Sequence, residues 1–268
     1  MYAGSLGRAA RMATTGLREM ALHRPVSRHG LLRVEIDARL RAVTGCRITH
    51  LDACAARRHF RCMFYRPDQP DAPRAGLLNA LVLPRPIGWI STLDAQGRAN
   101  LAPYSFFNAV AYTPPQIMFS ATGPHDHGGL KDSLANIEAT GEFVANLATW
   151  ELREAVNASS IGAPHGFDEF AHAGLAKAPA ELVKPPRVAQ SPVHLECVLS
   201  QIVELESVSP ERPARMVIGR VVGVHVADAL LVGGRIDPLR LDPIARLGYD
   251  QFTRLREVFA MKRPTWPL

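Results

Sequence analysis

Several short apolar segments of this chain have the length and composition of β-strands. Gly88 to Leu93 is an apolar, β-branched run, and Ala99 to Ser105 returns as a second strand-like segment. Between them, Asp94 to Gly97 has turn chemistry, because Gly97 adopts a positive φ angle without steric penalty. The stretch from Pro84 to Asn108 therefore predicts one β-hairpin, around which we expect the rest of the fold to be organised.

Four further segments predict strands. They are Gln116 to Ala121, Glu142 to Ala148, Val193 to Glu206 and Met216 to Val226. Within the last segment, Gly219 and Gly223 predict β-bulges or close approach of another group to the backbone. Six or more strands separated by turns indicate a mainly β protein, which we interpret as a β-barrel with a few flanking helices.

The predicted helices are fewer than the predicted strands. Asp132 to Thr140 predicts a helix, with Asp132 or Ser133 as its N-cap and Gly141 at its C-terminal end. Trp150 to Ser159 predicts a second helix. We expect both to cover the barrel.

The first 62 residues differ in composition from the remainder. They contain twelve Arg, no Lys and four acidic residues, a balance of +8, whereas residues 63–268 sum to −2 of the chain's total of +6. An Arg-rich, acid-poor segment fits a targeting peptide, a nucleic-acid-binding arm or an extension outside the folded domain. We favour the third interpretation: residues 1–62 are a disordered or non-native extension, residues 63–268 are the domain, and no nucleic-acid partner is predicted.

The positions of the cysteines and the lengths of the apolar runs indicate the redox compartment of the protein and whether it crosses a membrane. Cys46, Cys54 and Cys62 lie in the basic extension, and Cys197 is the remaining cysteine. Because neither a Cys-x-x-Cys pair nor a zinc-site spacing occurs, we expect a reduced, cytoplasmic protein with Cys197 in its core. No apolar stretch reaches about 18 residues, so the sequence predicts no membrane partner.

Residues that can bind a phosphate or a flat ring gather at the ends of the hairpin. Hydroxyls, amides and aromatic rings are supplied by Ser91, Thr92, Asn100, Ser105, Asn108, Trp89, Tyr104, Phe106 and Phe107. Lys131, Asp132 and Ser133 lie where a loop becomes a helix, and free N–H groups there favour an anion. An ordinary half-buried hairpin and a simple N-cap beside a solvated lysine would explain the same residues.

Common catalytic motifs are absent. The sequence has no Gly-x-Ser-x-Gly elbow, no Walker P-loop and no Gly-x-Gly-x-x-Gly at a strand–helix junction, which disfavours a Rossmann fold. His125-Asp126-His127 has two histidines in metal-ligand spacing, but adjacent glycines favour a flexible loop, and we predict no metal. We assign no catalytic residue.

A series of short motifs continues from the hairpin to the C-terminal region. They occupy Tyr112 to Ser120, Lys131 to Ile137, Thr140 to Leu147, Ala163 to Phe170, Ser191 to Cys197, Met216 to Val226 and Arg246 to Phe252. Each is weak alone, but together with the hairpin and in this order they resemble the flavin reductase-like family. The resemblance covers roughly Met63 to Pro264 and implies the fold of that family, the FMN-binding split β-barrel.

The resemblance also implies which residues contact FMN. Its phosphate would meet Lys131, Asp132 and Ser133, with Ser91 and Thr92 donating from the facing strand. Further contacts implied along the isoalloxazine ring and the ribityl chain are Trp89, Ala102, Tyr104, Ser105, Phe106, Asn108 and Ser120. His165 would either touch the nicotinamide or lie in a surface loop.

The implied activity is hydride transfer from NADH or NADPH to FMN. Electrons would then pass to free flavin, a partner oxygenase or another acceptor, and a flavin bound in this way supplies the chemistry itself. The resemblance further implies a homodimer with the flavin near its interface. Two alternatives stay open: a flavoprotein electron carrier that does not use nicotinamide, and a non-catalytic FMN-binding module.

Overall fold

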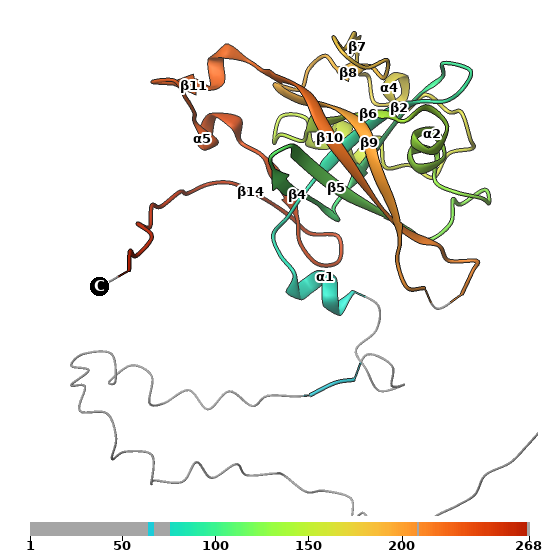
Figure 1. Cartoon of the computed structure of the whole chain (residues 1–268), viewed down its shortest axis with the longest axis horizontal. Coiled ribbons are helices and arrows are strands. Elements are labelled where there is room, and N and C mark those ends of the chain that lie inside the picture. The colour runs from blue at the N-terminus through green and yellow to red at the C-terminus, as the bar shows by residue number, and fades with distance from the viewer. Residues whose placement is uncertain (1–63, 67–75, 208, 267–268) are drawn as a thin grey trace, which may run out of the picture. The chain divides into compact units, whose positions relative to one another are not determined.

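One rolled antiparallel sheet forms the centre of the computed structural model, which describes residues 64–66, 76–207 and 209–266. The sheet has seven strands in the order β3-β2-β6-β9-β10-β5-β4. Its two longest strands, β9 and β10, run side by side in Figure 1. Their bounds are β2 (Gly88–Leu93), β3 (Ala99–Tyr104), β4 (Phe107–Tyr112), β5 (Pro115–Thr122), β6 (Glu142–Leu147), β9 (Val193–Glu204) and β10 (Ala214–Val226). The predicted extension, residues 1–62, lies outside the described residues.

The sheet rolls up because its two end strands are almost consecutive in the chain. β3 and β4 stand at opposite ends of the strand order, yet only Ser105 and Phe106 separate them. The carbonyl of Phe106 accepts a hydrogen bond of 2.8 Å from the N–H of Ser120 in β5. The turn from β3 to β4 thereby joins the two ends of the sheet, and the result is a mainly β barrel, as predicted.

Shorter elements surround the barrel. The helices are α1 (Leu77–Leu81), α2 (Asp132–Thr140), α3 (Arg153–Ala158), α4 (Glu169–His172), α5 (Pro238–Leu241) and the 3-10 helix η3 (Asp228–Leu230). A three-stranded sheet consists of β1 (Arg85–Pro86), β13 (Ile244–Arg246) and β14 (Phe252–Arg254). Two small strand pairs are β7 (Lys177–Ala178) with β8 (Arg187–Val188), and β11 (Leu231–Val232) with β12 (Arg235–Ile236).

Apolar side chains form two clusters, one on each side of β2. Ile90 packs inside the barrel with Leu134 and Ile137 of α2, whereas Trp89 packs outside it with Val156 of α3. Because successive side chains of a strand point to opposite faces, a strand covered on both sides is apolar throughout. This explains why Gly88–Leu93 reads as a continuous run, and each large side chain so buried stabilises the fold by roughly 1.5–3 kcal/mol.

The structure confirms the hairpin, the two bulges and the burial of Cys197. The register between β9 and β10 shifts at Gly219 and again before Gly223. At Gly219, a Cβ atom would lie only 2.3 Å from the ring of Phe143, so the ring requires a glycine opposite it. Cys197 is a free thiol that is fully buried in the core.

Two local predictions are corrected. The N-cap of α2 is Lys131, not Asp132 or Ser133, because its carbonyl accepts from the N–H groups of Leu134 and Ala135. The helix predicted from Trp150 is shorter, since α3 begins at Arg153. β4 was not predicted as a separate strand, because this edge strand is mostly exposed and lacks an alternating pattern.

Candidate functional site

A cavity of about 150 Å³ opens where β3, the start of α2 and the loop between α3 and α4 converge. β3 contributes Ala102, Pro103 and Tyr104, and α2 contributes Asp132 and Ser133 after the N-cap Lys131. The remaining lining residues are Asn100, His125, Asp126, Glu169 and the loop from Ser159 to Ala163.

The N-terminus of α2 gives this cavity its anion-binding character. No side chain caps the helix, and its N-cap is a lysine. The first N–H groups of a helix have no partner within the helix, and the helix dipole adds a partial positive charge there. An uncapped helix start beside a lysine at a cavity wall therefore suits a phosphate.

Beneath the cavity, buried polar side chains join α2 to the hairpin. The Ser133 hydroxyl donates to Oδ1 of Asn100 at 2.8 Å, and the Asn136 amide donates to the Thr92 hydroxyl at 2.9 Å. Thr92 in turn lies 3.3 Å from the same Asn100 oxygen. Because buried polar groups are costly to leave unpaired, this network fixes the start of α2 relative to β2 and β3.

Two buried titratable groups face the cavity. Burial raises the pKa of Tyr104 to about 12, so its phenol is neutral at physiological pH. Burial also raises the pKa of the Glu169 carboxyl above its usual range, with a further contribution from the charge of Asp132. Oε2 of Glu169 accepts from the N–H of Leu101 at 3.0 Å and from the Asn100 amide at 3.2 Å, which holds α4 against β3.

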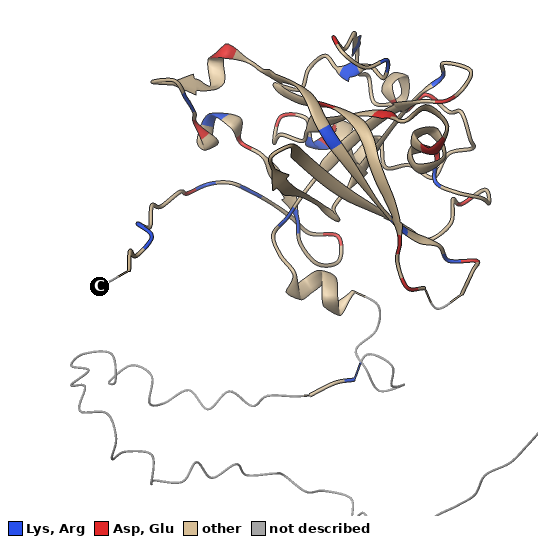
Figure 2. Ribbon diagram, viewed as in Figure 1, with Lys and Arg blue, Asp and Glu red and all other residues tan. Residues whose placement is uncertain are grey.

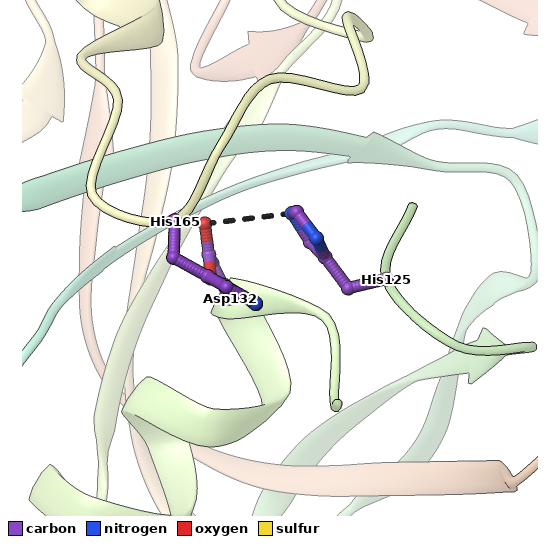
Figure 3. A group of neighbouring side chains, drawn as sticks. All are labelled: His125, Asp132 and His165. Carbon is purple, nitrogen blue, oxygen red and sulfur yellow. Dashed lines mark hydrogen bonds and ion pairs between the residues drawn. The ribbon is translucent and has the colours of Figure 1, made fainter. Parts of the chain in front are cut away.

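At the rim of the cavity, His125, Asp132 and His165 converge from three separate segments (Figure 3). Nδ1 of His165 pairs with the Asp132 carboxylate, and its Nε2 lies 2.9 Å from the carbonyl of Gly128. The His165 ring stacks on His125 with 3.9 Å between centroids. Nε2 of His125 lies 3.9 Å from the same carboxylate.

These contacts act on the protonation of the two rings in opposite directions. Both nitrogens of His165 face oxygens that can only accept, which favours the doubly protonated, cationic form of the ring. The Asp132 carboxylate and the Gly128 carbonyl accordingly raise the pKa of His165. Nδ1 of His125 accepts from the N–H of His127 at 3.0 Å, and burial together with the neighbouring His165 lowers the pKa of His125.

Two imidazoles and a carboxylate are also a donor set for a divalent metal. Here, however, the hydrogen bond from the backbone of His127 places the His125 proton on Nε2, the atom that faces Asp132. A metal would need a lone pair on that atom. The cluster as it stands pairs His165 with the Asp132 carboxylate and so joins two loops to the start of α2.

The structure brings five of the predicted contact residues into the cavity wall: Ala102, Tyr104, Lys131, Asp132 and Ser133. Trp89, Ser91 and Thr92 lie below it with no exposed surface. Nε1 of Trp89 donates to the hydroxyl of Ser159, which lines the cavity, at 2.8 Å. The Ser91 hydroxyl donates to the carbonyl of Pro186 at 2.6 Å. Trp89 and Thr92 therefore support residues of the wall without forming it, whereas Ser91 bonds to residues outside the wall.

The other predicted contacts lie elsewhere. Asn108 is exposed on the edge strand β4, and its side chain accepts from the N–H of Ala109. Ser120 is buried in β5, and Phe106 is half-buried in the turn between β3 and β4. Ser105 lines a neighbouring cavity. Asn108 does not reach the cavity because the strand β4 carries it along the outer edge of the sheet.

Sequence reasoning missed several lining residues. The motif from Ala163 to Phe170 contains Glu169, but nothing in the sequence indicates that its carboxylate packs against β3 and lines the cavity. Asn100 was noted only as a strand-end amide. Ser159 and Ser160 carry no distinguishing pattern, since their position depends on where α3 ends.

The barrel and its cavity define the class of protein. The model of the flavin reductase like domain matches residues 80–239, and the chain belongs to this family. None of the described helices combines the length and the apolar character needed to cross a membrane.

Individual relatives support the family assignment. An uncharacterized protein of Halalkalibacterium halodurans is 39% identical over 70% of this chain and 90% of its own length. Component B of nitrilotriacetate monooxygenase from Bacillus cereus is 31% identical, with a TM-score of 0.70 over 75% of this chain and 98% of that one. The 2-nitrobenzoate 2-nitroreductase of Pseudomonas fluorescens is 27% identical, with a TM-score of 0.60 over 71% and 90% of the two chains.

Proposed function

We propose that this protein is an FMN-dependent oxidoreductase that takes electrons from NADH or NADPH. The observation that carries the proposal is the uncapped start of α2, which meets Tyr104 and Ala102 of β3 in one cavity of a flavin reductase-like barrel. When bound, FMN would accept a hydride from the nicotinamide and release the electrons to an acceptor.

The residues present fit the two ends of this cofactor. Lys131 and the N–H groups at the start of α2 bind the phosphate, and Ser133 holds that helix start in place through Asn100. The backbone of β3 at Ala102 and the neutral phenol of Tyr104 meet the polar edge of the ring.

The negative charge of Asp132 must be neutralised if a phosphate binds at this helix start, because Asp132 is the first residue of the same helix. A carboxylate beside a phosphate is unfavourable unless a cation neutralises it. The His165 imidazolium pairs with Asp132, and Lys131 adds a second positive charge. The pair of His165 with Asp132 thus makes the site compatible with an anion.

The electron acceptor that we propose is either a partner oxygenase or a small molecule that the flavin reduces. Similarity to component B of a two-component monooxygenase supports the first, and similarity to a nitroreductase supports the second. Basic and acidic residues are interspersed on the described strands and loops in the view of Figure 2, which suits small-molecule chemistry better than nucleic-acid binding.

We further propose that the protein is a cytoplasmic homodimer. Beyond β14, the C-terminal segment from Leu255 to Trp266 contains four exposed apolar side chains, Val258, Phe259, Met261 and Trp266. Exposed apolar groups concentrated in one segment commonly mark an association surface.

The decisive experiment is anaerobic stopped-flow reduction of the full chain, loaded with FMN, by NADH and by NADPH. We expect at least one nucleotide to bleach the flavin absorbance rapidly. If dithionite bleaches the flavin and neither nucleotide does, the protein is an electron carrier or a binding module. If the protein binds no FMN, the proposal fails altogether.

A further inference from the structure

A second cavity, of about 220 Å³, adjoins the proposed flavin site. The two cavities share Pro103 and Ser160 in their walls. Two guanidinium groups line the second cavity, those of Arg85 in β1 and Arg246 in β13. The rest of the wall is mixed: it has apolar and aromatic residues, among them Ile87, Val156 and Phe252, and the neutral polar residues Asn79, Ser105, Asn157 and Ser160.

Arg85 is a buried cation that has no counter-ion among the described residues. Its relative exposure is 6%, and among the described residues no carboxylate lies within 4 Å of it. Its guanidinium donates to neutral acceptors only: the carbonyls of Val82 at 2.8 Å and Leu247 at 2.9 Å, that of Asn79, and the Ser105 hydroxyl at 3.5 Å. Carbonyls satisfy N–H groups, but they leave the net charge uncompensated, and a buried charge is costly unless it is paired.

Arg246 adds a second positive charge beside the first. Its carboxylate partner Asp250 is 3.7 Å away and fully exposed, which makes that pair weak. Arg246 also donates to the carbonyl of Tyr249, another residue of the cavity wall. Burial and the nearby Arg246 lower the pKa of Arg85, although an arginine stays charged at physiological pH.

A cavity with two cations and a partly apolar wall selects a particular class of ligand. An anionic group would neutralise the guanidiniums, and an apolar or aromatic body would cover Ile87 and Val156. We propose that this cavity binds a small organic anion, a carboxylate or phosphate monoester on an apolar body, next to the flavin. A role of this anion as electron donor or acceptor of the flavin rests on the proposed function, whereas the inference that the cavity binds an anion does not.

Calorimetric titration of the full-length protein with benzoate, phenyl phosphate and benzamide tests the proposal. Benzamide is a neutral analogue of benzoate with nearly the same shape. We expect benzoate or phenyl phosphate to bind at least ten-fold more tightly than benzamide, and the tighter of the two anions identifies the group recognised. Equal binding of benzoate and benzamide, or no binding of any of the three, would overturn the proposal.

Two substitutions locate the binding site. Arg246→Gln should weaken the preferred anion about ten-fold and leave benzamide unchanged, because one charge-assisted contact is lost. Arg215→Gln is the matched control, because Arg215 lies on β10 outside this cavity. Its guanidinium pairs with Glu138 of α2 and Glu204 of β9. Arg85→Gln should have the larger effect if circular dichroism shows that it folds, and Arg246→Gln decides the question if it does not. An unchanged anion affinity in Arg246→Gln would refute the assignment.

FMN affinity is measured on the same samples. A wild-type protein that binds and reduces FMN but binds benzoate no more tightly than benzamide would refute only the anion site. Anion binding that persists in a protein unable to bind FMN refutes only the proposed function.

Discussion

The ring of Phe107 in β4 lies directly against the backbone of Gly88 in β2. A Cβ atom placed on Gly88 would be 2.3 Å from Cδ2 of Phe107. β4 is one end strand of the sheet and β2 lies next to the other end strand, β3, so this contact spans the closure of the barrel. A glycine is needed at position 88 because the closing aromatic ring fills the space of any side chain.

Gly88→Ala should therefore destabilise the barrel. Overpacking a well-packed core costs about 1–3 kcal/mol, and the Phe107 ring cannot retreat without loosening the closure. Gly223→Ala is the control, because a Cβ atom there would meet its nearest neighbour at an ordinary 3.4 Å. Denaturant unfolding of both variants measures the difference. Equal stability of the two would show that Phe107 moves aside freely.

Replacing Lys131 and Ser133 should lower the affinity for FMN, which carries a phosphate, more than the affinity for riboflavin, which does not. We expect Lys131→Ala to weaken FMN about ten-fold or more and riboflavin far less, since a charge-assisted hydrogen bond contributes roughly 1.5–3 kcal/mol. Ser133→Ala should add to the loss for FMN, because it releases the helix start from Asn100. Lys184→Ala, an exposed lysine outside this cavity, is the control. Fluorescence titration with both flavins provides the measurement. Equal losses for FMN and riboflavin would assign the two residues a structural role.

The pair formed by His165 and Asp132 should make stability depend on pH. The pKa of His165 is raised in the folded protein, so its stabilisation is complete below the ordinary histidine pKa and is lost as the pH rises through the raised value. Wild type should exceed His165→Gln in stability by about 0.2–1 kcal/mol at pH 5.5, because the ring is 46% exposed, and by less at pH 8.5. Unfolding curves at both pH values test this, with His172→Gln as a control. A difference that does not change with pH would contradict the imidazolium assignment.

The C-terminal segment should hold the proposed dimer together. Phe259→Ser with Met261→Ser should shift the protein towards monomer, because both side chains are more than 80% exposed in the single chain. Lys262→Ser with Arg263→Ser changes the same segment without removing apolar surface. Light scattering at micromolar concentration reports the mass of each. A wild-type monomer with flavin fully bound would end the proposal of a dimer.

A chain that begins at Met63 should fold and bind FMN as well as the full chain. The family match begins at residue 80, and residues 1–62 combine many arginines with little apolar pattern, so they have little surface to bury. Thermal melting and FMN titration of both forms make the comparison. A large drop in melting temperature or in flavin affinity would place the first 62 residues within the fold.

The sequence alone determined the local elements of this protein. The hairpin of β2 and β3, the end of α2 at Gly141 and the bulges at Gly219 and Gly223 follow from turn chemistry and from the spacing of apolar residues. Tyr104 and Lys131 stand at the end and the start of such elements, and the family resemblance implied that they contact the flavin.

Only the tertiary structure decided which distant residues meet. His165 reaches Asp132 across 33 positions, Glu169 reaches Leu101 across 68, and Arg246 shares a cavity with Arg85. The closure of the barrel also withdrew Trp89 from the cavity wall and carried Asn108 to the outer edge. Periodicity reports which face of an element is buried, whereas the packing of one element on another depends on how the whole sheet rolls, and that is not encoded in any single segment.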